Sequence, residues 1–160
     1  MAVILEGLVM SFWLLLVCVI GIANGPAEMV CIYEKDVQER AVELGLTTRE
    51  KIKRANTLAA LAIFLPQMFV VPTVVALYNG VSGFWNGFGQ IFAVYMISNL
   101  FDRLFIDEWW VGRTKAWVIP GTEDLMPYIP MKQKLVKWIG TPVLFAIIAA
   151  AASGIIQLIG

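Results

Sequence analysis

A short polar stripe interrupts an otherwise apolar run between residues 81 and 106. At 100° per residue, four of its side chains fall within an arc of about 100°. They are Tyr95, Ser98, Asn99 and Asp102. Polar groups that face hydrocarbon are unfavourable, so the stripe must face protein, water or a ligand. It therefore predicts a polar packing contact or a binding site, and the sequence leaves both open for Asp102.

Charged residues directly after the stripe extend this candidate site. Arg103 follows at once, and Asp107 and Glu108 come about a turn later. Carboxylates at this spacing could bind a divalent cation or exchange protons. For Asp107 and Glu108 we favour the alternative, charges at the membrane interface beside a belt of tryptophans.

Three further residues complete the set of candidates. Asn24 and Glu28 flank the helix break expected at Gly25-Pro26 and could approach the inner mouth of the protein. Arg113 could bind an anionic headgroup or phosphate. The expected ligand-binding residues are thus Asp102, Asn99, Ser98, Tyr95, Glu28, Asn24, Arg103 and Arg113, and the sequence predicts neither a metal site nor a cofactor. It assigns no catalytic residue.

Composition limits the classes of protein to which this chain can belong. Of its 160 residues, 59% are hydrophobic and 15% charged, whereas a soluble domain is about half apolar and about a quarter charged. The net charge is zero, so no basic face for nucleic acid is expected. There is no histidine, which removes the commonest metal ligand and the usual acid/base at neutral pH.

Four apolar runs have the length that a membrane-spanning helix needs, about 20 residues. They cover residues 2–23, 57–78, 81–106 and 138–159. The first lacks the positive flank of a cleaved signal peptide and carries Glu6 instead. The sequence thus predicts an all-α, polytopic integral membrane protein with four transmembrane helices in a single domain, 1–160.

The positive residues predict the orientation of this domain. Every Lys and Arg falls within residues 24–56 or 103–137, and positive charge is retained on the cytoplasmic side of membrane helices. We expect segments 24–56 and 107–137 in the cytosol and both termini outside, in the plasma membrane. The first segment should form an amphipathic helical elbow over residues 27–44, and the second a loop folded back over the inner mouth.

Small residues at four-residue spacing allow helices to pack closely. They occur at Gly83 and Gly87, and at Ala146, Ala150 and Gly154. We expect self-association into a homo-oligomer through the Gly83/Gly87 face or the Ala146/Ala150/Gly154 face, with membrane lipid as the other partner.

One segment resembles a known group of proteins. The run from Ile119 to Glu123, following Asp107 and Trp109-Trp110, is similar to an Ile-Pro-Gly-Thr-Glu segment of small, uncharacterised multi-pass bacterial membrane proteins. The resemblance covers a minor part of the chain. It implies a membrane location and no particular activity.

Three functions are consistent with these features. The first is binding of a lipid or amphipathic ligand at a cytosolic-side cavity, with or without catalysis. The overall plan is similar to that of membrane-associated eicosanoid and glutathione enzymes, although only at the level of fold. The second is a transporter or channel subunit with a path lined by Pro66, Pro72, Gln67, Asn86 and Gln90. The third is a structural or accessory subunit.

Overall fold

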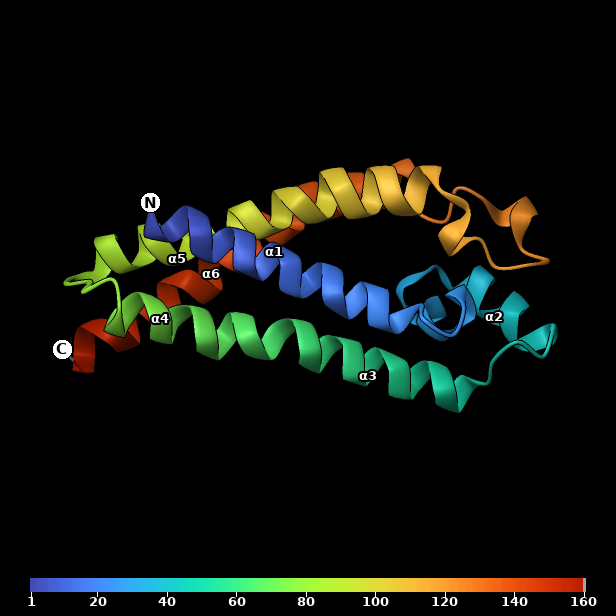
Figure 1. Cartoon of the computed structure of the whole chain (residues 1–160), viewed down its shortest axis with the longest axis horizontal. Helices are drawn as coiled ribbons and strands as arrows, with labels where there is room; N and C mark the ends of the chain where they lie inside the picture. The colour runs from blue at the N-terminus through green and yellow to red at the C-terminus, as the bar shows by residue number, and fades with distance from the viewer. Residues whose placement is uncertain (160) are drawn as a thin grey trace.

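The computed structural model describes residues 1–159 as an elongated bundle of helices (Figure 1). Helices make up 82% of the chain, with no strand in the described part. The bundle begins with α1 (Ala2–Gly21) and ends with α6 (Met131–Ile159). The start of α1 and the end of α6 lie at the same end of the molecule. We call the opposite end, formed by residues 22–48 and 112–130, the charged end.

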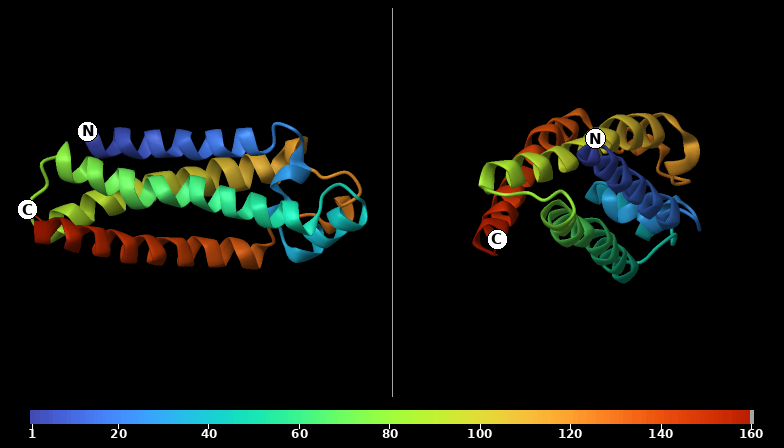
Figure 2. Two further views of the ribbon diagram at one scale, coloured as in Figure 1. Left: turned by 90° about the horizontal axis from the view of Figure 1, so that it is seen from below. Right: turned by 60° about the vertical axis from the view of Figure 1, so that its left-hand side comes forward.

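The remaining elements connect these two helices. In chain order they are the 3-10 helix η1 (Pro26–Ile32), α2 (Lys35–Glu43), α3 (Arg49–Leu65), the π-helix η2 (Pro66–Val70), α4 (Val71–Leu77), α5 (Phe84–Phe101), the π-helix η3 (Asp102–Val111), and the 3-10 turns η4 (Lys115–Trp117) and η5 (Glu123–Leu125). Helix α5 packs most extensively, with α1 on one side and α6 on the other (Figure 2).

Three helical stretches in the described residues are long and apolar enough to cross a membrane. They are Ala2–Gly21, Arg49–Leu77 and Met131–Leu158. The all-α prediction is confirmed, and the three stretches support a membrane protein. The fourth predicted span corresponds to α5, whose polar residues lower its mean hydropathy, and it is not among the three. A fourth span therefore stays a prediction.

The expected elbow helix over residues 27–44 is not continuous. It divides into η1 and α2, because Tyr33 between them has an extended backbone, with ψ 172°. The Gln38 side chain donates a hydrogen bond of 2.8 Å to the Tyr33 carbonyl, which replaces a helical bond there. Helix α2 ends at Glu43, and the chain turns at Gly45, whose φ of 72° favours glycine.

Two prolines explain the π-helical turn between α3 and α4. The Val71 N–H donates to the carbonyl of Pro66, five residues earlier. Pro72 has no N–H to offer to the Gln67 carbonyl. The Tyr95 hydroxyl of α5 donates to this carbonyl instead, at 2.5 Å. The prolines thus create a backbone acceptor that fastens α5 to η2, as a low-dielectric interior requires.

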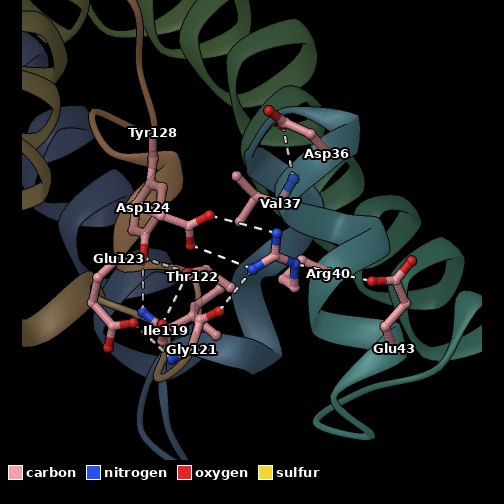
Figure 3. Close-up of polar contacts among 10 residues, drawn as sticks. All are labelled: Asp36, Val37, Arg40, Glu43, Ile119, Gly121, Thr122, Glu123, Asp124 and Tyr128. Carbon is pink, nitrogen blue, oxygen red and sulfur yellow. Dashed lines mark hydrogen bonds and ion pairs between the residues drawn. The ribbon is translucent and has the colours of Figure 1, made fainter.

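The loop after η3 packs against η1 and α2 at the charged end. Trp117 and Ile119 are completely buried. The Tyr33 hydroxyl donates to the Trp117 carbonyl at 3.1 Å. Farther out, Arg40 of α2 pairs with Asp124 at 3.3 Å (Figure 3). The aromatic core beneath and the ion pair above hold this loop in one position.

Gly87 lies inside the bundle, where α5 crosses α6. A Cβ at this position would lie 2.6 Å from the Ser153 hydroxyl oxygen, which donates to the Phe84 carbonyl at 2.5 Å. This face of α5 is therefore occupied within one chain. Self-association through the Gly83/Gly87 face or through the Ala146/Ala150/Gly154 face stays a prediction.

Candidate functional site

A cavity of 280 Å³ lies near the charged end and is amphipathic. One part of its wall is apolar and comes from α1, α3 and α6, including Leu14, Ile63, Phe64, Leu144 and Phe145. The other part is polar and comes from η2, α5, η3 and α6: Gln67, Ser98, Asn99, Asp102, Arg103, Asp107, Lys137 and Thr141. Segments far apart in sequence thus line one partly open space with both apolar and polar residues.

The passage from α5 into η3 sets the polar side. Because the backbone remains helical through this junction, Ser98, Asn99 and Asp102 keep to one face of the helix. Arg103 and Asp107 are four residues apart and adjacent on the helix surface. They are 8% and 9% exposed, respectively, so the charged groups point into the protein.

These charges form a balanced network. Arg103 contacts Asp107 directly and lies 3.0 Å from the carboxylate of Asp102. The Lys137 ammonium, from α6, lies 3.1 Å from Asp107. Two carboxylates therefore face two cations. Buried charges are tolerated when they are paired in this way, and the network fixes η3 against α6.

Asn99 is the unusual member of the site. It is 3% exposed, and neither its Nδ2 nor its Oδ1 has a hydrogen-bond partner among the described residues. The same holds for Gln67 Oε1 and Arg103 Nε. A buried polar group without a partner costs about 1–3 kcal/mol. Because both amide atoms of Asn99 are affected, exchanging its nitrogen and oxygen would not remove the cost.

The structure brings together four of the predicted site residues. Ser98, Asn99, Asp102 and Arg103 all line the cavity. Tyr95 lies in the same helix but stands apart. Its hydroxyl donates a hydrogen bond to the Gln67 carbonyl, so Tyr95 joins α5 to η2.

Three other predicted residues lie elsewhere. Asn24 and Glu28 are exposed and fall outside the set of described residues that line the cavity. Arg113 is also exposed, 3.5 Å from Glu108. Glu108 in turn accepts a 2.5 Å bond from Lys134, and this bond holds the pKa of the Glu108 carboxyl below its usual value. Arg113 is thus part of a surface ion-pair cluster.

The cavity also contains residues that sequence reasoning placed elsewhere. Asp107 was interpreted as an interface charge, and Gln67 belonged to the alternative transport path. Lys137 was counted only among the positive residues. The sequence did contain a sign that Gln67 faces the protein interior, because it is a polar residue between two prolines in an apolar helix. Nothing in the sequence places Lys137 opposite Asp107.

The residues of the alternative path do not meet. Asn86 and Gln90 bond to each other at 3.1 Å, and Gln90 accepts a bond of 2.9 Å from Asn79. Asn79 follows α4, at the end of the bundle where α1 begins. Gln67 lines the cavity near the charged end. These amides form a local cluster at one end of the molecule, separate from the cavity.

Fold and cavity together define the class: an all-helical protein with helices able to span a membrane and, near one end, a cavity lined by both apolar and polar residues. Within residues 1–159, no group of three or more His, Cys, Asp or Glu side chains is arranged to hold a metal ion. Comparison of the chain with protein-family models, curated proteins and solved structures gave no match.

Proposed function

We propose that this protein is a four-span membrane protein that binds a lipid or another amphipathic ligand in the cavity near its charged end. Helix α5 supplies the fourth span, with the charged end in the cytosol and both termini outside, in the plasma membrane. The restriction of Lys and Arg to residues 24–56 and 103–137 supports this orientation. Catalysis is not part of the proposal.

Asn99 is the observation that carries the proposal. It is a buried amide with a free donor and a free acceptor, in a wall that also contains paired charges. Partner atoms from a ligand would remove the cost of its burial. The apolar residues of the wall, such as Phe64 and Phe145, would contact the ligand's hydrocarbon. An amphipathic molecule satisfies both parts at once.

Retention of lipid during purification tests this function. The protein is purified in a mild detergent, and bound lipid is quantified by mass spectrometry for the wild type, Asn99→Leu and Asn86→Leu. Asn86 is the matched control, since it is an exposed amide on the same helix. We expect Asn99→Leu to lose the bound molecule and Asn86→Leu to keep it. Equal retention by all three proteins would refute the proposed function.

A further inference from the structure

We infer that the cavity forms one binding site with a neighbouring apolar groove, and that this site takes a zwitterionic lipid whose headgroup carries a primary ammonium and a phosphate. The inference rests on the proposed function and deepens it by naming the class of ligand. The headgroup and the first part of a hydrocarbon chain occupy the cavity, and the rest of the chain follows the groove.

The groove has a volume of 860 Å³ and lies between α4 and α6. Met68, Phe69 and Pro72 line one side, and Ala152 and Ile155 line the other. From Met68 to Leu77 it follows the helix for about 14 Å, at ~1.5 Å per residue. Each CH₂ group buried there adds to affinity.

Consecutive residues of the π-helix η2 line the two spaces, although no described residue lines both. Gln67 lines the cavity, and the next two residues, Met68 and Phe69, line the groove. On the other side both spaces are bounded by α6, through Phe145 for the cavity and Ala152 for the groove. The wide turn at η2 thus lies between the cavity, which has both polar and apolar lining residues, and the groove, whose lining is mostly apolar. A lipid has the same order of polar and apolar parts.

The charges of the cavity favour a headgroup with no net charge. Asp102 and Asp107 are balanced by Arg103 and Lys137. A ligand with a net charge would bring an uncompensated charge beside side chains that are themselves buried and already paired, which is costly. A zwitterion brings equal and opposite charges and can align them with the carboxylates and the cations.

The unpartnered atoms identify both ends of that zwitterion. Asn99 Oδ1 and Gln67 Oε1 are acceptors without donors among the residues described, and Asp102 lines the same cavity. Asn99 Nδ2 and Arg103 Nε are donors without acceptors, again within the described residues. A primary ammonium supplies three donors and a phosphate supplies acceptors. The two groups match the two sets of atoms.

The same matching predicts discrimination between headgroups. A trimethylammonium group has no N–H, so it would leave both amide oxygens unpaired. We therefore expect an ethanolamine-type headgroup to bind at least about tenfold more tightly than a choline-type headgroup with identical chains.

Native mass spectrometry of the delipidated full chain in detergent tests the inference. Ethanolamine-type, choline-type and anionic glycerol-type phospholipids with identical chains are titrated separately. The variants are Asn99→Leu, Asn86→Leu and Ala152→Trp, of which the last fills the groove. We expect preference for the ethanolamine type in the wild type and Asn86→Leu, loss of this preference in Asn99→Leu, and at least about tenfold weaker binding of every lipid in Ala152→Trp.

The outcomes separate this inference from the proposed function. Equal binding of all three lipids, with sensitivity to Asn99→Leu, would overturn the headgroup assignment and leave the binding site intact. Unchanged binding in Ala152→Trp would overturn the groove assignment alone, provided that its circular dichroism spectrum matches the wild type. Binding that is insensitive to Asn99→Leu would overturn both the inference and the function.

Discussion

Burial of the unpaired Asn99 amide lowers the free energy of unfolding, whereas the same amide is proposed to bind the ligand. The two effects can be measured separately. Replacing its amide with an apolar group of similar size removes an unpaired donor and acceptor from a buried position. In delipidated protein we expect Asn99→Leu to raise the free energy of unfolding by about 1–3 kcal/mol. Thermal unfolding in detergent with and without added lipid measures this. A variant less stable than the wild type without lipid would indicate that Asn99 has a structural partner.

Tyr33 makes the stability of the charged end sensitive to high pH. Burial raises the pKa of its hydroxyl well above the usual value, so folding favours the neutral phenol. Its contribution is therefore fully present below the unfolded pKa of about 10 and is lost as the pH rises above it. The hydroxyl also bonds to the Trp117 carbonyl.

The variant Tyr33→Phe should be about 1 kcal/mol less stable at pH 7, because that hydrogen bond is lost. Above about pH 10 its stability should fall less steeply than that of the wild type. Tyr78→Phe is the control, since Tyr78 is 82% exposed, and it should follow the wild-type curve. The free energy of unfolding is measured from about pH 8 to about pH 11, a range that includes the usual tyrosine pKa of about 10. Parallel curves for all three proteins would contradict this assignment.

At the scale of elements, the bond from Tyr95 to the Gln67 carbonyl joins α5 to η2. Tyr95→Phe keeps the ring contact with Phe145 but leaves a buried carbonyl without its donor. We expect a loss of about 1–3 kcal/mol, measured by thermal unfolding in detergent. Pro72→Ala restores a backbone N–H that can bond within the helix. The double variant should therefore lose less than the sum of the single variants, and strict additivity would argue against this coupling.

At the scale of the whole molecule, the proposed orientation predicts which surfaces a reagent outside the cell can reach. In a background with Cys18 and Cys31 replaced by alanine, we expect Ser82→Cys to be labelled by an impermeant thiol reagent in intact cells. Lys51→Cys should react only after the membrane is opened. Both positions are exposed and lie near opposite ends of the bundle. The reverse pattern would invert the topology, and labelling of both would exclude α3–α4 as a span.

The membrane-protein class follows from the sequence alone, because hydropathy and helix length are local properties of each segment. The polar stripe also follows from local rules, since Ser98, Asn99 and Asp102 share a face whatever surrounds them. What surrounds them was decided only by tertiary structure. Gln67 and Lys137 reach the cavity from other helices, and the partner of Tyr95 is a carbonyl that two distant prolines expose. Asn24, Glu28 and Arg113 lie outside the cavity for the same reason. Their position depends on where whole helices and loops pack, and that packing joins residues far apart in the chain.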